Sequence, residues 1–443
     1  MIGRPTDDAK AERQARILPP APLGKLPPQP WMEAAETQQV LRALAADGAE
    51  VRFIGGCVRD AILKRPVHDI DLALARRPDQ VVSLLQRAGI KAVPTGIDHG
   101  TVTALLGAMQ FEITSLRVDV ESFGRRARIA YTDDWIADAA RRDFTFNALS
   151  STPNGDIYDY FDGMDDLAYG RVRFVGKAEE RIGEDVLRLL RFFRFYAWYG
   201  RPPIDQGALI ACRDGAEKIS MLSGERVRGE VFRTLMAPDP GDVFDLMRTW
   251  RVLEHVLPEA KDTARLKMLS WLDTRAIRLE SVTADPLRRL GALITQDKFA
   301  ATRIADRLKL SNRQRERLSV MMSEPGAVNP DADADTIARA LYRLGAEAAR
   351  DQALLSWAGE LCETPRAPQG RNARWIDLLQ RIDSWQPVAF PLKGRDAQAL
   401  GLAAGPGMGA LLKEVQAWWE NDGCRAGYDA CLEHLGTLIR ARQ

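Results

Sequence analysis

Residues 51–60 read VRFIGGCVRD, an apolar segment followed by two glycines and a helix-forming stretch. We expect a strand over 51–54 and a helix from Cys57, joined by a tight turn at Gly55 and Gly56. Glycine lets a backbone approach a phosphate closely, and the N-terminus of a helix offers N–H donors. The turn is a candidate phosphate-binding loop; the alternative is an ordinary strand-to-helix turn.

Shortly after this turn, residues 68–72 read HDIDL. On a strand, Asp69 and Asp71 would point to the same face, with Ile70 buried on the other. Two carboxylates at that distance repel unless a cation lies between them, and Mg²⁺ prefers oxygen ligands and bridges to phosphates. The alternative is a pair of solvated aspartates at a sheet edge. Glu112, on a later expected strand, is either a third carboxylate of this site or an exposed strand residue.

A third segment, residues 141–149, reads RRDFTFNAL. Its Arg142 is expected to pair with a triphosphate or stack on a base, because guanidinium does both; the alternative is a surface charge cluster. Asp143 and Asn147 are expected to support it. Residues 159–167, DYFDGMDDL, are expected to form a glycine turn with a structural role.

The most specific segment is RIGEDVLRLLRFFRF at 181–195, where charged residues recur every three positions. On the helix that we expect over 184–199, they would form one slanting polar stripe opposite an apolar face. Such a stripe is either a salt-bridged helix surface or a positive face suited to a nucleotide. Its members are Asp185, Arg188, Arg191 and Arg194.

Asp185 and Arg188 suggest which bases such a face would accept. A carboxylate accepts from an exocyclic amine, and a guanidinium donates to a ring nitrogen or a carbonyl. Cytosine and adenine both present an amine beside a ring acceptor, whereas uracil and guanine present a carbonyl beside a ring N–H. One Asp–Arg pair would therefore accept C and A and reject U and G.

A later segment, SGERVRGE at 223–230, is expected to begin a helix that braces the helix over 184–199, which we call the reading helix. In this hypothesis a carboxylate of the segment holds an arginine of the reading helix in position. The alternative is an ordinary solvated first turn. The residues concerned are Glu225, Arg226 and Glu230.

The net charge is only +1, from 62 Lys+Arg and 61 Asp+Glu, so any nucleic acid must be bound by local patches. Residues 301–318 are one candidate patch, with a solvated helix face as the alternative. The five cysteines are scattered and unpaired in pattern, which argues against a disulfide framework or a zinc site and favours a reducing cytosol. The sequence shows no membrane-spanning run and no signal peptide. The basic residues of the patch are Arg303, Arg307, Lys309, Arg313, Arg315 and Arg317.

Taken in order, six segments resemble the class II CCA-adding tRNA nucleotidyltransferases and the related bacterial poly(A) polymerases, of the polymerase beta superfamily. They span about residues 50–235, and the reading helix is more similar to the CCA-adding branch. The segments are GGCVRD, DID, RRDFTFNAL, DGMDDL, GEDVLRLLRFFRF and ERVRGE.

The resemblance implies an α+β fold, with an N-terminal nucleotidyltransferase palm of mixed five-stranded sheet followed by an all-α neck, body and tail. The Pro-rich, polar composition of residues 1–30 predicts a flexible or extended arm. The domains that the resemblance implies after it are the head over 31–170, a base-recognising neck over 171–265, a body over 266–360 and a tRNA-binding tail over 361–443.

The resemblance also assigns roles to residues. It implies Asp69 and Asp71 as metal ligands and, with Glu112, as catalytic residues. The implied nucleotide contacts are Gly55, Gly56, Arg59, Arg142, Asp185, Arg188, Arg191 and Arg194. The supporting residues are Asp143, Asn147, Glu225, Arg226 and Glu230.

On this resemblance we expect a Mg²⁺-dependent enzyme that adds C, C and A to the tRNA 3′ end from CTP and ATP, by two-metal nucleotidyl transfer. One alternative is a poly(A) polymerase or an A-only-adding RNA nucleotidyltransferase; another is an inactive RNA-binding relative, against which the intact Asp69 and Asp71 argue. The expected partners are the 3′ end and acceptor stem of tRNA, with no membrane. A cytoplasmic monomer or weak dimer is expected.

Overall fold

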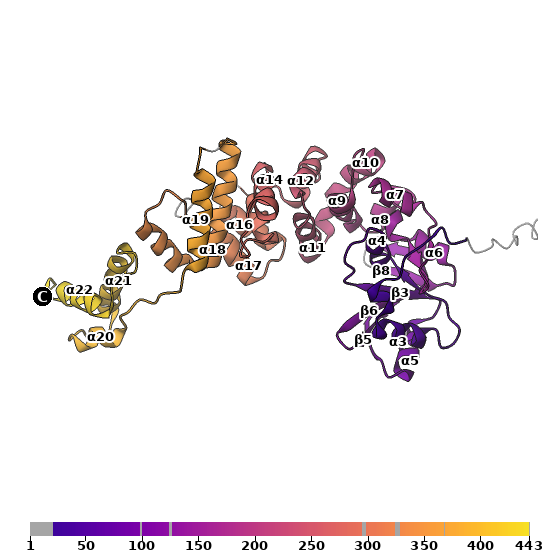
Figure 1. The fold of residues 1–443 in the computed structure, drawn as a ribbon, viewed down its shortest axis with the longest axis horizontal. Helices are drawn as coiled ribbons and strands as arrows, with labels where there is room; N and C mark the ends of the chain where they lie inside the picture. Colours follow the sequence, from indigo (N-terminus) through magenta and orange to yellow (C-terminus); the bar gives the residue numbers. More distant parts are fainter. Residues whose placement is uncertain are drawn as a thin grey trace, which may run out of the picture. The chain divides into compact units, whose positions relative to one another are not determined.

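The computed structural model describes residues 21–97, 100–123, 126–294, 298–323, 328–366 and 368–442. The chain divides into two compact units, residues 1–215 and 216–443. The first holds all of the described strands, and the described secondary structure of the second is helical (Figure 1). The expected α+β class, with a mixed sheet followed by helices, is confirmed.

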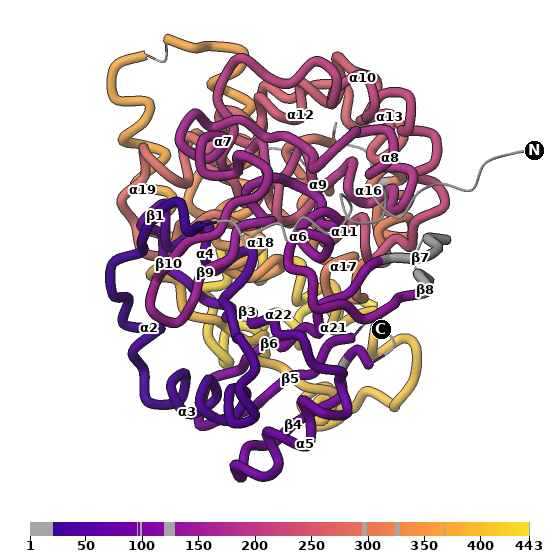
Figure 2. Tube along the Cα trace, turned by 90° about the vertical axis from the view of Figure 1, so that its right-hand side faces the viewer, coloured from indigo at the N-terminus to yellow at the C-terminus, as the bar shows by residue number. Residues whose placement is uncertain are grey.

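The main sheet of the first unit has the strand order β1-β10-β9-β2-β3-β6-β5-β4. Its one parallel pair is β3 with β6, and its other pairs are antiparallel. Figure 2 shows β3 and β6 side by side. The strands are β1 (Gly24–Lys25), β2 (Val51–Ile54), β3 (Ile70–Leu74), β4 (Lys91–Gly96), β5 (Thr101–Leu106), β6 (Met109–Ser115), β9 (Ser150–Ser151) and β10 (Asp156–Tyr158).

The expected number of five strands is wrong, because the described sheet has eight. Five strands of four to seven residues, β2 to β6, form one side of it. Strands β1, β9 and β10, of two or three residues each, extend it beyond β2. Such short strands carry too little alternation to be recognised in a sequence.

The structure describes only the last third of the expected flexible or extended N-terminal arm. Residues 1–20 of that arm lie outside the described residues. Gly24 and Lys25 pair with β10 as an edge strand, and Leu26 is buried. The last third of the arm is therefore part of the head.

Helices α4 (Gly56–Ile62) and α5 (Pro78–Arg87) pack on the sheet, α4 against β2 and β3 and α5 against β4 and β5. The core between the layers is apolar, with Phe53, Leu72 and Phe111 fully buried. Two further strands form a separate antiparallel ribbon. The remaining elements up to residue 158 are α2 (Pro30–Glu33), α3 (Ala35–Leu44), β7 (Arg117–Phe123), β8 (Arg126–Tyr131), α6 (Trp135–Ala140) and the 3-10 turn η3 (Thr145–Asn147).

Aromatic side chains hold helix α9 (Leu187–Tyr199) against the segment 141–149. Phe144 and Phe146 contact Phe195 of α9 edge to face, with ring centroids 5.1 and 5.4 Å apart. Such pairs favour one fixed packing of the two elements. The neighbouring helices are α7 (Gly163–Tyr169), α8 (Ala178–Glu184) and α10 (Gln206–Gly215).

The second unit is a series of helices whose core includes a fully buried ion pair between Arg289 and Asp273, 2.7 Å apart. Within the described residues, no helix is long and apolar enough to cross a membrane. Its α-helices are α11 (Gly224–Leu235), α12 (Pro240–Thr249), α13 (Leu253–Val256), α14 (Ala264–Trp271), α15 (Pro286–Ala292), α16 (Lys298–Arg307), α17 (Asn312–Met321), α18 (Ala334–Glu363), α19 (Arg371–Ser384), α20 (Gly394–Ala399), α21 (Pro406–Asn421) and α22 (Tyr428–Arg440).

Candidate active site

The glycine turn lies between β2 and α4, as the sequence predicts. Gly55 has φ 66° and ψ −122°, a conformation that is essentially restricted to glycine. A Cβ placed there would lie 3.5 Å from Nη1 of Arg142 and 3.9 Å from Oδ2 of Asp71. The space that a side chain at Gly55 would occupy is therefore bordered by a guanidinium and a carboxylate.

The carboxylates meet at the parallel strand pair. Asp71 of β3 is in register with Glu112 of β6, and Asp69 lies one residue before β3. Burial raises the pKa of Asp71 to about 6, and the negative charges of Glu112 and Asp69 add to the effect. Asp69 and Glu112 are exposed, whereas Asp71 is half-buried. The structure thus brings the three expected carboxylates into electrostatic contact.

These residues suit a divalent cation, because the charges that raise the pKa of Asp71 are those that a cation would neutralise. In the described part of the chain, no group of three or more His, Cys, Asp or Glu side chains is arranged to hold a metal ion. Magnesium is commonly held by one or two carboxylates together with substrate phosphates. Asp69 and Asp71 are the pair that fits this mode.

Arg142 borders the glycine turn together with Asp71 and is held by a residue that the sequence did not reveal. Its Nη2 donates to Oδ2 of Asp138 at 3.0 Å. Asp138 is buried and also accepts two hydrogen bonds from Arg141. Asp138 therefore fixes the orientation of the Arg142 guanidinium, whose positive charge acts on Asp71.

Arg59 is nearly buried, with 8% of its surface exposed. Its guanidinium donates to both carboxylate oxygens of Asp60, at 3.0 and 2.7 Å, and to Oδ1 of Asn147 at 2.8 Å. A Cβ on Gly56 would lie 3.7 Å from its Nη2. Three of its five N–H groups are thus engaged within the protein, and a triphosphate contact by Arg59 stays a prediction.

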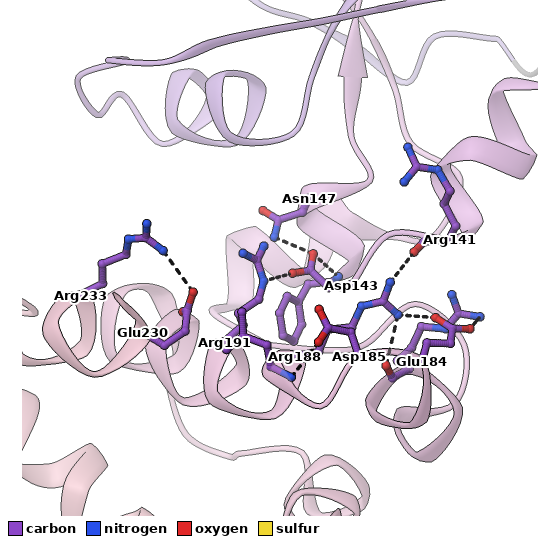
Figure 3. Close-up of polar contacts among 12 residues, drawn as sticks. Arg141, Asp143, Asn147, Glu184, Asp185, Arg188, Arg191, Glu230 and Arg233 are labelled. Carbon is purple, nitrogen blue, oxygen red and sulfur yellow. Dashed lines mark hydrogen bonds and ion pairs between the residues drawn. The ribbon is translucent and has the colours of Figure 1, made fainter. Parts of the chain in front are cut away.

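Asp143 is buried and joins the segment 141–149 to α9. Its Oδ1 accepts from Nδ2 of Asn147 at 3.1 Å, and its Oδ2 accepts from Nε of Arg191 at 2.5 Å (Figure 3). Burial alone would raise the pKa of Asp143, but the Arg191 charge and the Asn147 hydrogen bond outweigh it and hold the pKa below its ordinary value. Asp143 therefore anchors Arg191 of α9 to the segment 141–149, and Asn147 holds Asp143 in place.

The expected continuous helix over 184–199 is wrong. Asp185 is extended, with φ −148° and ψ 108°, and lies between α8 and α9. Its side chain accepts from the N–H of Leu187 at 3.1 Å, as an aspartate does at the start of a helix. Asp185 therefore precedes the helix that carries Arg188, and the four charges do not share one helix.

Arg188 is fixed by three acceptors. It pairs with Glu184, donates through Nη1 to the carbonyl of Arg181 at 3.2 Å, and donates through Nη2 to the carbonyl of Arg141 at 3.0 Å (Figure 3). Arg194 lies over the Phe195 ring at 4.4 Å. These arginines are ordered by the protein itself.

The expected bracing residues belong to α11 of the second unit. Glu225 is exposed and Arg226 is half-buried. Glu230 is buried and accepts from Nη1 of Arg233 at 3.1 Å. Their action on the reading helix stays a prediction.

Part of the expected basic patch is committed to internal ion pairs. Arg307 donates to both carboxylate oxygens of Glu259, at 2.7 and 2.8 Å. Arg317 pairs with Asp351 at 2.7 Å and with Asp285 at 3.0 Å. Arg313 has an 88% exposed side chain, and its ion-pair partner, the exposed Glu347, lies 3.7 Å away. Of these three arginines, Arg313 is therefore the one placed to meet a phosphate.

Known protein families match the same segments. Residues 51–173 match the family described as "Poly A polymerase head domain". Residues 203–263 match "Probable RNA and SrmB- binding site of polymerase A".

Curated relatives extend over most of the chain. The CCA tRNA nucleotidyltransferase 1, mitochondrial, of Danio rerio is 32% identical over 394 residues, which are 87% of each protein. The CCA-adding enzyme of Streptococcus gordonii is 34% identical over 299 residues, covering 64% of this chain and 73% of that protein.

Solved structures share the fold. The Bacillus stearothermophilus CCA-adding enzyme in complex with CTP has a TM-score of 0.75 at 22% identity, covering 94% of this chain and 99% of that one. The Thermotoga maritima CCA-adding enzyme complexed with tRNA has a TM-score of 0.60 at 18% identity, covering 90% and 95%.

Proposed function

The chain belongs to the CCA tRNA nucleotidyltransferase family, and on this premise we propose that it adds C, C and A to the 3′ end of tRNA from CTP and ATP. The reaction attaches each nucleotide to the terminal 3′-hydroxyl and releases pyrophosphate. It is an RNA nucleotidyltransferase, and the alternative of A-only or poly(A) addition becomes an outcome of the test.

The observation that carries the proposal is that Arg142 and Asp71 both border the space beside Gly55, which has no side chain to fill it. The absence of a side chain there leaves room for a triphosphate, whose charge Arg142 would balance. Asp69 and Asp71 would hold the divalent cation, which we propose to be Mg²⁺. A cation bound there supplies a lowered pKa for the primer 3′-hydroxyl and a counter-charge for the leaving pyrophosphate.

Base choice is assigned to Asp185 and Arg188. The hydrogen bonds of Arg188 to Glu184, Arg181 and Arg141 use Nη1 twice and Nη2 once, so Nε–H and one Nη2–H are the donors that we assign to a base. The backbone of Asp185 is extended, and its carboxylate lies at the N-terminus of α9, where it accepts from the N–H of Leu187. We propose that the carboxylate accepts the amine shared by cytosine and adenine, and that Arg188 donates to the acceptor beside it.

The remaining assignments are also proposals. We place tRNA binding in the helical tail over 361–443. The five unpaired cysteines are consistent with action in the cytoplasm. A monomer or weak dimer is the expected state in sedimentation.

The test uses a tRNA transcript that lacks CCA and labelled nucleotides. We expect label from CTP alone, no label from ATP alone, and label from ATP on a transcript that already ends in CC. Chelation of the metal, or Asp71→Asn, should abolish both the CTP signal and the ATP signal on the CC-ended transcript. Repeated addition from ATP alone would replace the proposal with poly(A) synthesis.

A further inference from the structure

Helix α9 is joined to two other segments of the first unit, the segment 141–149 and helix α4, which follows the glycine turn. Near its start, Nε of Arg191 donates to Asp143 at 2.5 Å. At its end, the hydroxyl of Tyr199 donates to Oδ1 of Asp60 at 2.9 Å. The two points are eight residues apart, which is about 12 Å along a helix. Two such anchors oppose both sliding and rotation of α9.

The two anchors belong to one continuous hydrogen-bond chain. Asp60 accepts two hydrogen bonds from Arg59, Arg59 donates to Asn147 at 2.8 Å, and Asn147 donates to Asp143 at 3.1 Å. The chain therefore runs from Tyr199 through α4 and the turn η3 back to Arg191. We call these six residues the α9 clamp: Asp60, Arg59, Asn147, Asp143, Arg191 and Tyr199.

Burial makes the clamp cooperative. Arg59, Asn147 and Asp143 are each no more than 8% exposed. A buried polar group that loses its partner costs more than the bond was worth, because water does not replace the partner. The Arg59 guanidinium also lies 4.6 Å from the centre of the Tyr199 ring, and the ring centroids of Tyr199 and Phe146 are 6.0 Å apart. Loss of one end of the clamp should therefore loosen the other.

The clamp connects the two elements that a nucleotide would contact together. Its α4 end directly follows Gly55 and Gly56, and its α9 end carries Arg188, Arg191 and Arg194. A nucleotide held at both triphosphate and base gains selectivity only if the distance between the two elements is fixed.

We propose that Tyr199 is a positioning residue for base choice, which acts through Asp60 and the α9 clamp to fix the reading helix relative to the glycine turn. This inference rests on the proposed function. Tyr199 touches no reacting atom, and its hydroxyl contributes by holding the end of α9.

The test is Tyr199→Phe, which removes the hydroxyl and keeps the ring over Arg59. We expect the ratio of kcat/KM for CTP to that for UTP to fall by about 10- to 20-fold, the lower end of the range for loss of one hydrogen bond to a charged group. The melting temperature should stay within a few degrees of the wild type. Tyr196→Phe is the matched control, because Tyr196 lies in the same helix and takes no part in the clamp; its ratio should not change.

A double-mutant cycle tests whether Tyr199 and Asp60 act through one shared anchor or independently of each other. Asp60→Asn disrupts the same anchor, so the double variant should lose no more selectivity than the worse single variant. An unchanged ratio in folded Tyr199→Phe, or additive losses, would overturn the inference. Failure of the proposed function is distinguishable, because the wild type would then show no preference for CTP over UTP.

Discussion

Glu112 lies directly opposite Asp71 on the one parallel strand pair of the sheet. Residues in register on neighbouring strands present their side chains on the same face, so the two carboxylates face the same space. Their repulsion adds to burial in raising the pKa of Asp71, and Arg142 offsets part of it. The carboxylates of Asp71 and Glu112 therefore concentrate negative charge beside the glycine turn, where a cation would neutralise it.

Replacing Asp71 with Asn should abolish incorporation without unfolding the protein. The carboxylate repels its neighbours in the folded state, so removal of its charge should leave the melting temperature unchanged or slightly higher. Activity should fall by more than about 10³-fold if the metal is lost. Retention of activity within about tenfold, measured as labelled nucleotide on tRNA, would contradict the metal assignment.

Gly55→Ala should be inactive for a local reason. A side chain at φ 66° costs about 1–3 kcal/mol, and the new Cβ would stand 3.5 Å from Nη1 of Arg142. Gly48→Ala is the matched control, because Gly48 also has a positive φ of 81° but has no atom within 4 Å of the added Cβ. Both variants should lose stability, and only Gly55→Ala should lose nucleotide incorporation. Equal activities would remove the turn from the site.

Asp143→Asn should destabilise the protein in a pH-dependent way. The folded state holds the pKa of Asp143 below its ordinary value, so its ionised form stabilises the fold at neutral pH. That contribution is complete above the unfolded pKa of about 3.9 and is lost as the pH falls through the lower folded pKa. The gap in melting temperature between wild type and variant should therefore narrow below about pH 4.

The control for this measurement is Asp165→Asn. Asp165 is exposed and makes no ion pair with any described residue. The melting temperatures of Asp165→Asn and the wild type should be equal at both pH 7 and pH 3. A gap for Asp143→Asn that stays constant from pH 7 to pH 3 would mean that the lost contact is not ionic.

Arg313 and Arg317 should separate tRNA binding from stability. Arg313→Ala removes an exposed charge and should reduce the salt slope of tRNA binding by about one unit, with no change in melting temperature. Arg317→Ala leaves the buried Asp351 carboxylate without this arginine and should cost about 3–5 kcal/mol of stability. An unchanged salt slope for Arg313→Ala would assign that helix face to solvent.

The proposed base reading by Asp185 is separable from its hydrogen bond to the start of α9, and serine distinguishes the two. Asp185→Ser keeps an oxygen able to accept from the N–H of Leu187, whereas Asp185→Ala does not. If the carboxylate reads the base, both variants should lower the CTP-to-UTP ratio of kcat/KM by roughly 10- to 100-fold, because the incoming amine loses its acceptor. Restoration of the ratio by serine would reduce Asp185 to a helix cap.

The sequence predicted the parts of the site that depend on local patterns. The glycine turn and the Asp69–Asp71 strand follow from spacing, and the structure has both within a residue or two. The break at Asp185 escaped prediction because a three-residue repeat of charges matches helical spacing even when its first member is a cap. The identity of Asp as a favoured helix-start residue was the available signal.

Long-range partners could not be predicted in the same way. Tyr199 and Asp60 are 139 residues apart, and Arg317 and Asp351 are 34 apart. Nothing in a single sequence distinguishes an arginine that meets a buried aspartate from one that meets a phosphate. Asp60 is the last residue of VRFIGGCVRD, but its hydrogen bond with Tyr199 becomes visible only when α9 is packed against α4.

The most direct test of the account is the sequence of tRNA 3′ ends after reaction of the wild-type protein with all four nucleotides and Mg²⁺, starting from a transcript without CCA. The account predicts ends that read CCA and stop there, with no U or G added and no extension by the Asp71→Asn protein. Runs of A, or ends in which U and C occur equally, would contradict it.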